Sequence, residues 1–155
     1  MELSQAEIIA RQVVDHLAPF CQRVAVVGSI RRRKPFPRDI DILLIPGNQG
    51  RLLVALQGLG TLKYGGQKAM QCSYQGEQVD VYFATPETWA TLLLIRTGSA
   101  AHNVRLATRA KRRGWRLHAD GRGLFDQIGR RLAGETEEAF FEALELPYAE
   151  PWERR

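Results

Sequence analysis

Two short segments of this chain combine aspartate with an alternating apolar pattern, and they limit the folds that it can adopt. Residues 39–45 read DIDILLI and residues 77–83 read EQVDVYF. Successive side chains of a β-strand point to opposite faces, so Asp39 and Asp41 share one face while the isoleucines between and after them occupy the other. The same alternation separates Asp80 from its apolar neighbours. The pattern predicts a sheet with one face buried in a core and one face carrying carboxylates.

Other apolar and β-branched runs in the first part of the chain supply the remaining strands of this sheet. These runs cover residues 23–27, 61–65 and 68–74. Glycine turns at Gly65-Gly66 and Gly76-Glu77 join the later strands, so most strands should pair antiparallel. Helical spacing of apolar residues predicts helices over residues 4–20 and 47–60, the first opened by a Ser4 and Glu7 capping box.

The pattern changes near Pro86, where we place the boundary between two domains, residues 1–85 and 86–155. Helical spacing dominates beyond it, interrupted by one hairpin. The predicted elements are helices over 86–98, 99–114 and 135–146, a hairpin over 115–125 and an irregular tail over 147–155. The chain is therefore expected to be an α+β protein. Its first domain holds a mainly antiparallel mixed sheet with helices on one face, and its second is a small α/β lobe.

Three carboxylates on one open sheet face repel one another unless positive charge lies between them. If the two strands are neighbours, Asp39, Asp41 and Asp80 converge, and hard oxygen ligands with room for water suit Mg²⁺. Such a site can hold two ions, with Mn²⁺ as a substitute, and serves phosphoryl or nucleotidyl transfer. The alternative is structural: Asp39 caps a strand, and Asp41 pairs with Arg32 or Arg38.

A glycine turn lies directly before these aspartates, in the stretch GSIRRRKPFPRDID that begins at Gly28. Gly28 can adopt backbone angles closed to other residues and lets the chain come close to a phosphate, to which the Ser29 hydroxyl and nearby amides can donate. An arginine just beyond, such as Arg32, adds a planar charged group that matches phosphate oxygens. A Gly-Ser pair alone is more often an ordinary hairpin turn. Its link to the arginines and aspartates is what indicates a triphosphate site.

Positive charge exceeds negative charge in this chain, with 22 Lys and Arg against 17 Asp and Glu and a formal net charge of +5. The excess favours a polyanionic partner, and many of the basic residues crowd into one predicted helix and the segment after it. They are Arg105, Arg109, Lys111, Arg112, Arg113 and Arg116. We expect this segment to contact DNA phosphates, and the alternative is a solvated helix face.

Several kinds of protein are excluded by what the sequence does not contain. No apolar run is long enough to cross a bilayer, and the first residues lack the basic and apolar regions of a secretory signal. Cys21 and Cys72 match no zinc spacing, and both fit small buried residues in a reducing compartment. We expect a monomer without a membrane partner, located in the cytoplasm, at a nucleoid or in a virus, and not secreted.

Taken together, these motifs resemble the nucleotidyltransferase palm of the family X DNA polymerases, the polymerase beta-like group. The palm motifs are Gly28-Ser29-x-Arg31-Arg32, Asp39-x-Asp41 and Val79-Asp80-Val81. The discriminating stretch is TGSAAHN, residues 97–103, followed by a basic helix, which is similar to the nucleotide-selecting subdomain of that family. Residues 134–138 and 146–151 are similar to its ending. The resemblance extends from about residue 20 to the C-terminus.

The resemblance implies a role for each matching residue of the palm. Asp39 and Asp41 would bridge both metal ions, and Asp80 would bind the catalytic metal and help to take the proton from the primer 3′-hydroxyl. The β- and γ-phosphates would lie in a loop shaped by Gly28. The residues that would hold them are Ser29 and Arg32, and Arg38 belongs to the same nucleotide-binding set.

The resemblance also assigns roles in the second domain. Asn103 would lie against the minor-groove edge of the incoming base, and Gly98 would let the backbone approach the sugar. One interpretation gives His102 a role beside the nucleotide. The other gives it a structural or solvent-facing role.

Three departures from the family pattern accompany this resemblance. Most relatives carry aromatic residues before Thr-Gly, where this chain has Ile95-Arg96, so packing against the sugar would differ. Gln78 replaces an arginine two residues before Asp80, which removes a partner that would orient the carboxylate. Helix-hairpin-helix domains usually precede the palm, and one predicted helix cannot be such a domain. We therefore expect the minimal form of the family, with palm and nucleotide-selecting subdomain only.

The function expected from this resemblance is template-directed, gap-filling DNA synthesis. A nucleotide would pass from a dNTP to a primer 3′-hydroxyl on gapped or primer-template DNA, with release of pyrophosphate. Two alternatives remain open. A minimal nucleotidyltransferase that acts without a template on a tRNA or a protein would share the palm but has no need of TGSAAHN. A non-catalytic scaffold that binds nucleic acid would have no reason to keep three aspartates.

Overall fold

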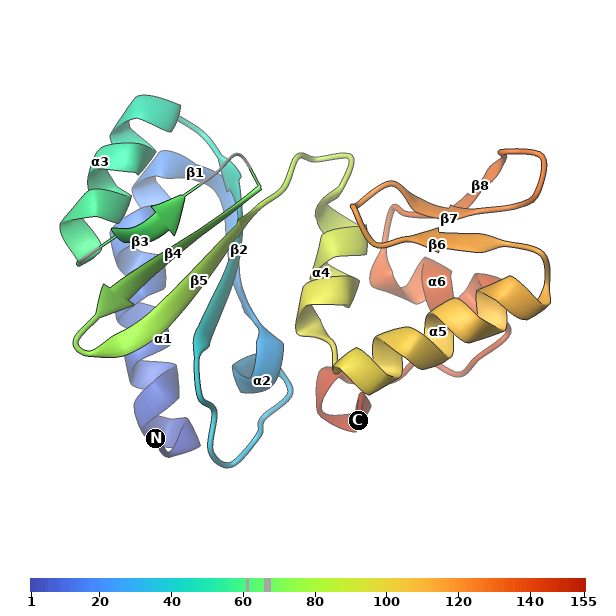
Figure 1. Cartoon of the computed structure of the whole chain (residues 1–155), viewed down its shortest axis with the longest axis horizontal. Helices are drawn as coiled ribbons and strands as arrows, with labels where there is room; N and C mark the ends of the chain where they lie inside the picture. Colours follow the sequence, from blue (N-terminus) through green and yellow to red (C-terminus); the bar gives the residue numbers. More distant parts are fainter. Residues whose placement is uncertain (61, 66–67) are drawn as a thin grey trace. The chain divides into compact units, whose positions relative to one another are not determined.

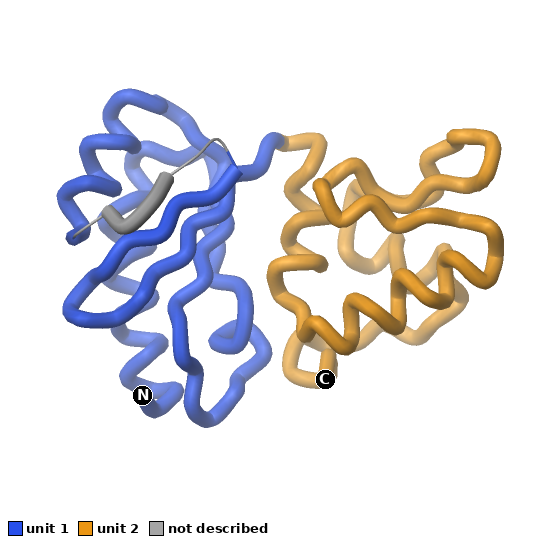
Figure 2. Tube along the Cα trace, in the orientation of Figure 1, with its two compact units in different colours: residues 1–85 blue, residues 86–155 orange. Residues whose placement is uncertain are grey.

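The alternating segments do form strands, and they belong to the first of two units of the chain. The structure is a computed structural model that describes residues 1–60, 62–65 and 68–155. Contacts divide it into unit 1, Met1–Thr85, and unit 2, Pro86–Arg155 (Figure 2). The division falls at Pro86, where the spacing of apolar residues changes in the sequence. Each unit has a buried core of its own.

Unit 1 is built on a five-stranded sheet in the order β1-β2-β5-β4-β3 (Figure 1). Its strands are β1 (Cys21–Val27), β2 (Ile40–Pro46), β3 (Leu62–Gly65), β4 (Ala69–Tyr74) and β5 (Glu77–Phe83). β2 and β5 run parallel, and the other neighbouring pairs are antiparallel. This confirms the prediction of a mixed, mainly antiparallel sheet in an α+β fold.

Helices cover one face of this sheet (Figure 1). They are α1 (Leu3–Leu17), which continues into the short 3-10 helix η1 (Ala18–Phe20), and α3 (Gln49–Leu59); a short helix, α2 (Gly28–Arg31), follows β1. The apolar residues that alternate with the aspartates are fully buried in the core that these helices form with the sheet: Ile40, Ile42, Val79 and Val81. Burying a side chain of this size contributes about 1.5–3 kcal/mol, and a slip of one residue would lose that contribution along the whole strand. The apolar set therefore fixes the face on which the aspartates lie.

The start of α1 differs from the prediction. The helix begins at Leu3 with Glu2 as its N-cap, and no described side chain caps it, so Ser4 lies inside the helix and the capping box with Glu7 is wrong. The reason lies elsewhere in the chain, because the backbone N–H of Leu3 donates to the carbonyl of Pro35 at 3.0 Å. A free N–H at a helix start needs one acceptor, and here a loop provides it.

Two boundaries in the sheet also differ from the prediction. β2 begins at Ile40, so Asp39 lies just before the strand instead of being its first residue. The turn between β4 and β5 is formed by Gln75 and Gly76, which both have positive φ (52° and 80°). Such a two-residue turn suits the twist of an antiparallel hairpin. The parts of the predicted strand and turn at Thr61 and Gly66 lie outside the described residues.

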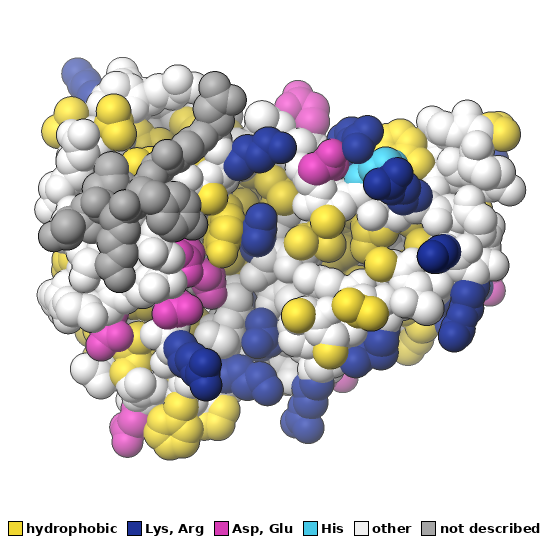
Figure 3. Space-filling view, in the orientation of Figure 1, with side chains coloured by type: hydrophobic (Ala, Val, Ile, Leu, Met, Phe, Trp, Pro, Cys, Tyr) yellow, Lys and Arg dark blue, Asp and Glu magenta, His cyan; other side chains and the backbone are white. Residues whose placement is uncertain are grey.

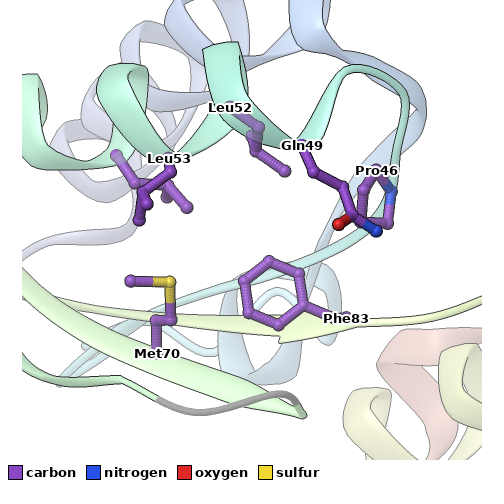
Figure 4. A pocket seen from close by; sticks show the side chains of 7 residues that line it. Pro46, Gln49, Leu52, Leu53, Met70 and Phe83 are labelled. Carbon is purple, nitrogen blue, oxygen red and sulfur yellow. The ribbon is translucent and has the colours of Figure 1, made fainter.

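A pocket of about 420 Å³ lies between α3 and the sheet (Figure 4). It is lined by Pro46, Gln49, Leu52, Leu53, Leu56, Met70 and Phe83. Met70 and Phe83 pack with the core on the helix-covered face of the sheet, opposite to the face of the aspartates. This apolar pocket is therefore separate from the candidate site described below.

Unit 2 packs helices against a three-stranded antiparallel sheet in the order β6-β7-β8. Its elements are α4 (Trp89–Thr97), α5 (Ala100–Arg112), β6 (Arg116–His118), β7 (Gly123–Phe125), β8 (Arg131–Ala133), α6 (Glu137–Ala143) and the 3-10 helix η2 (Pro151–Glu153). The predicted hairpin thus has a third strand, β8. The described residues of both units contain no helix long and apolar enough to span a bilayer.

A buried ion pair anchors the C-terminal tail, which is irregular as predicted except for the 3-10 helix η2. Arg154 Nη1 donates to Glu137 Oε2 at the start of α6 at 2.5 Å, and both side chains are almost fully buried. The guanidinium also lies over the rings of Phe141 and Tyr148, at 5.3 and 5.5 Å from their centroids. Removing one partner of a buried pair costs about 3–5 kcal/mol, so the tail is part of the unit 2 core.

Candidate active site

Asp41 and Asp80 lie opposite each other on the parallel strands β2 and β5. Their Cα atoms are register partners, so both side chains project from the same face of the sheet. Like charges directly opposite each other on neighbouring strands are destabilising. The pair therefore needs hydrogen-bond donors or positive charge around it, and its surroundings supply both.

Two side-chain amides hold the Asp80 carboxylate. Gln71 Nε2 donates to Asp80 Oδ1 at 2.8 Å, and Gln78 Nε2 donates to Oδ2 at 3.1 Å. We expected Gln78, in the place of an arginine, to have lost the contact that orients Asp80, and this expectation is wrong. The amide retains the contact as a neutral donor, so the carboxylate is oriented without gaining a cation from this position.

Gln71 is a site residue that the sequence analysis missed. It is the register partner of Asp80 in the β4–β5 hairpin. The sequence did contain a signal for this pairing. A two-residue turn at Gln75-Gly76 pairs the residues on its two sides in order, which places Gln71 opposite Asp80. Placing the turn one residue later hid this pairing.

Asp41 packs against the backbone of Gly28. Val27, the last residue of β1, is the register partner of Asp41, so the chain turns into α2 directly beside the carboxylate. Gly28 has a φ of 65°, and a Cβ on it would lie 2.8 Å from Asp41 Cγ and closer still to Oδ2. Glycine is thus required here both by its backbone conformation and by the carboxylate next to it.

Arg32 is close enough to Asp41 for their charges to interact. Burial lowers the pKa of Arg32, and the negative charge of Asp41 acts in the opposite direction. The turn itself is held by the backbone, since Arg32 N donates to Gly28 O at 3.1 Å and Lys34 N donates to Ser29 O at 3.0 Å. The Gly28 turn, Ser29 and Arg32 therefore form one corner with Asp41.

Asp39 and Arg38 lie just before β2, and Arg38 is exposed. Asp39 makes polar contacts within the structure. Among the described residues, no three His, Cys, Asp or Glu side chains are grouped so that they could hold an ion together. The carboxylate oxygens of Asp41 and Asp80 are ligands that suit Mg²⁺. A site completed by Asp39 stays a prediction.

The residues predicted to select the nucleotide lie together where α4 meets α5 in unit 2. Gly98 ends α4 with a φ of 69°, and its peptide bond to Ser99 is cis. Ser99 Oγ accepts from His102 N at 3.1 Å and caps α5, while Asn103 Nδ2 donates to Ile95 O at 2.8 Å. The amide of Asn103 therefore links the two helices in this structure. Its contact with a base stays a prediction.

His102 is buried, and its ring lies 5.9 Å from that of Phe141, centroid to centroid. This surrounding agrees with the structural reading of His102. The reading in which it lies beside a nucleotide stays a prediction.

Comparison with known proteins identifies the group to which this architecture is related. A family model described as DNA polymerase beta thumb matches residues 92–155, which lie in unit 2. Over 121 residues the chain is 29% identical to the DNA polymerase/3′-5′ exonuclease PolX of Bacillus subtilis (strain 168). The chain is similar to DNA polymerases of the family X group. The alignment with PolX covers 73% of this chain and 21% of the PolX protein, so the chain spans about a fifth of the length of that curated relative.

A solved structure shows a fold that this chain shares. The crystal structure of Leishmania infantum polymerase beta, described as a ternary P/T complex, matches with a TM-score of 0.81. The match covers 100% of this chain and 76% of the other, at 19% sequence identity. This chain therefore shares the fold of the matched part of that polymerase.

The basic segment over residues 105–116 contains two kinds of residue. Three of its arginines make contacts within unit 2. Arg105 donates to the carbonyl of Arg155, Arg109 Nε donates to Leu144 O at 2.6 Å, and Arg113 lies over the Trp115 ring at 5.5 Å. The other kind consists of Lys111, Arg112 and Arg116, which are exposed, as Arg105 also is. The sequence could not separate the two kinds, because Arg155 and Leu144, the partners of Arg105 and Arg109, come from distant parts of the chain.

The two cysteines, Cys21 and Cys72, are free thiols in the described structure. Burial raises the pKa of Cys21 to about 11, and burial followed by the charge of Asp80 raises the pKa of Cys72. Both thiols are therefore protonated at neutral pH, which makes them poor nucleophiles and poor metal ligands.

Proposed function

We propose that this chain transfers a nucleotide from a dNTP to the 3′-hydroxyl of a DNA primer on a template and releases pyrophosphate. The observation that carries the proposal is the register of Asp41 and Asp80 beside the Gly28 turn and Arg32. The match of unit 2 to a polymerase thumb favours a template-directed reaction over nucleotide transfer to a tRNA or a protein.

The carboxylates would act as a unit in this reaction. Asp41 and Asp80, with Asp39 as a third ligand, would hold Mg²⁺, which when bound supplies positive charge to the transferring phosphate. A carboxylate has about four acceptor positions, and the two amides that donate to Asp80 occupy only part of them. Asp80 therefore keeps the capacity to accept the proton of the primer 3′-hydroxyl.

The corner at Gly28 would bind the triphosphate. Ser29 offers a hydroxyl donor, and Arg32 offers a planar group that stays charged at neutral pH although burial lowers its pKa. Gly28 leaves the backbone open to close approach. These residues would orient the phosphates, and orientation with charge stabilisation is most of what phosphoryl transfer requires of a protein.

Extension of a labelled primer across a one-nucleotide gap in the presence of Mg²⁺ tests the proposal. Asp80→Asn should lower turnover by about 100-fold or more, since several kcal/mol of stabilisation depend on this carboxylate. Asp15→Asn, the same change at an exposed position of α1, is the matched control and should leave turnover unaltered. Wild-type turnover by Asp80→Asn would reject the proposal.

Template dependence distinguishes the proposal from its alternative. Each dNTP and each ribonucleotide is supplied singly against each of the four template bases. Incorporation that follows base pairing is the expected result. Incorporation without a template, onto a tRNA or a protein, would favour the template-free reaction instead.

A further inference from the structure

The loop between α2 and β2, residues 32–39, presents an aromatic side chain to solvent. Phe36 is 70% exposed, and Lys34 and Arg38 near it are exposed as well. At the lower end of unit 1, where Figure 1 draws this loop, Figure 3 shows hydrophobic and basic side chains next to one another. Single exposed apolar residues are ordinary on protein surfaces. This one differs because its loop is fixed and basic.

The first half of the loop is held by backbone hydrogen bonds. Arg33 N donates to Ile30 O at 2.9 Å, and Lys34 N donates to Ser29 O at 3.0 Å. Arg33 has a φ of 58°, in the left-handed region that is unfavourable for residues other than glycine. The loop thus keeps a basic side chain at a position where glycine would be easier to accommodate.

The second half of the loop is held by two prolines. Pro35 and Pro37 flank Phe36 and restrict the backbone on both sides of it. The carbonyl of Pro35 accepts from Leu3 N of α1, and Pro37 is buried. The backbone on both sides of Phe36 is therefore fixed while its side chain remains exposed to solvent. Little conformational entropy would be lost when this side chain binds a flat partner.

We propose that Phe36 stacks on an unpaired base of the DNA strand bound at the site, while Lys34 and Arg38 contact the adjacent phosphates. This inference rests on the proposed function, because the loop leads directly from the Gly28 turn to Asp39 and Asp41 and its ligand is the DNA engaged there. An aromatic face with flanking cations is the arrangement by which proteins bind single strands without reading sequence. Stacking of this kind strengthens binding by roughly 5- to 150-fold per base.

Fluorescence anisotropy with labelled DNA tests the proposal, using a duplex with a single-stranded overhang and a blunt duplex of the same length. No dNTP or metal is present, so the result is independent of turnover. Phe36→Ala should weaken binding to the overhang DNA by about 5-fold or more and leave blunt-duplex binding unaltered. Phe36→Trp, which keeps an aromatic face, should bind the overhang as well as the wild type or better.

Ile128→Ala is the matched control, since Ile128 is a large apolar side chain that is 81% exposed in unit 2. Three results would each overturn the proposal: equal affinities for Phe36→Ala and Ile128→Ala, equal weakening on both DNAs, or a Phe36→Trp protein as weak as Phe36→Ala. A failure of the proposed function would be recognised separately, because the wild type would then bind the overhang through Phe36 without extending a primer.

Discussion

At the scale of the residue, Gly28 decides whether Asp41 can occupy the site. Gly28→Ala and Gly129→Ala both place alanine at a positive φ, 65° and 83°, and each should lose about 1–2 kcal/mol of stability for that reason. At position 28 the new Cβ also meets the Asp41 carboxylate, whereas no heavy atom of the described residues lies within 4 Å at position 129. We expect Gly28→Ala to lose about 1–3 kcal/mol more, measured by urea unfolding.

The displaced carboxylate should also lower the turnover of Gly28→Ala and not that of Gly129→Ala. Equal losses of stability and equal turnover in the two variants would contradict the packing of Asp41 against Gly28.

A second prediction at the residue scale concerns the two side-chain amides that donate to Asp80. Gln71→Leu and Gln78→Leu each remove one donor to the Asp80 carboxylate, and residues that orient a catalytic ligand typically affect activity by about 10- to 100-fold. Steady-state kinetics should show the loss in kcat, with little change in the KM for dNTP. Gln22→Leu, at an exposed position of β1, is the control. A double variant with wild-type kcat would show that Asp80 does not depend on these amides.

At the scale of the element, α5 carries basic residues with two different tasks. Arg109 donates to two carbonyls directly after α6, Leu144 O and Glu145 O, at 2.6 and 3.2 Å, while Arg112 is exposed. Arg109→Met should therefore lower the unfolding free energy by about 1–2 kcal/mol, whereas Arg112→Met should leave it unaltered. Arg112→Met should instead reduce the slope of log affinity for DNA against log salt by about 1.

Denaturant unfolding and anisotropy at several salt concentrations measure these two effects. If Arg109→Met retained full stability and alone reduced the salt slope, the division of tasks along α5 would be reversed.

The turn between β7 and β8 predicts a dependence of stability on pH. The backbone N–H groups of Arg130 and Ile128 donate to Asp126 at 2.8 and 3.1 Å, and they lower the pKa of Asp126, the Arg130 N–H most strongly. This contribution is present above the usual pKa of an aspartate and is lost as the pH falls below about 4. Asp126→Asn should weaken the acid dependence of Tm, and an identical pH profile in the variant would contradict this role.

Most elements that the sequence predicted have enough residues to display a period; the exceptions are the three-residue strands β6 and β7, predicted together as one hairpin. α1, α3, α4, α5 and the strands with the aspartates have this length, whereas α2 has four residues and β8 has three, too few for alternation or helical spacing to be recognised. The capping box at Ser4 was wrong because the helix begins one residue earlier, at Leu3, whose N–H donates to the loop carbonyl of Pro35. Partners such as Leu144 for Arg109 depend on how distant elements pack, which no local pattern contains.

At the scale of the whole molecule, the parallel pairing of β2 and β5 brings together aspartates that are far apart in the sequence. The chain between them forms α3, β3 and β4, and β5 returns next to β2 in the register that places Asp41 opposite Asp80. The alternation could be recognised in each segment separately. That the two strands are neighbours could only be assumed from the sequence, because the packed core sets the register between distant strands.

In the proposed reaction Asp41 and Asp80 act as a unit, and a double-mutant cycle tests this directly. Single-turnover incorporation into a gapped duplex with Mg²⁺ would be measured for Asp41→Asn, Asp80→Asn and the double variant. Residues that act as a unit are strongly non-additive, so the double variant should lose about as much as either single variant. Losses that multiply, or a single variant with wild-type turnover, would contradict the account.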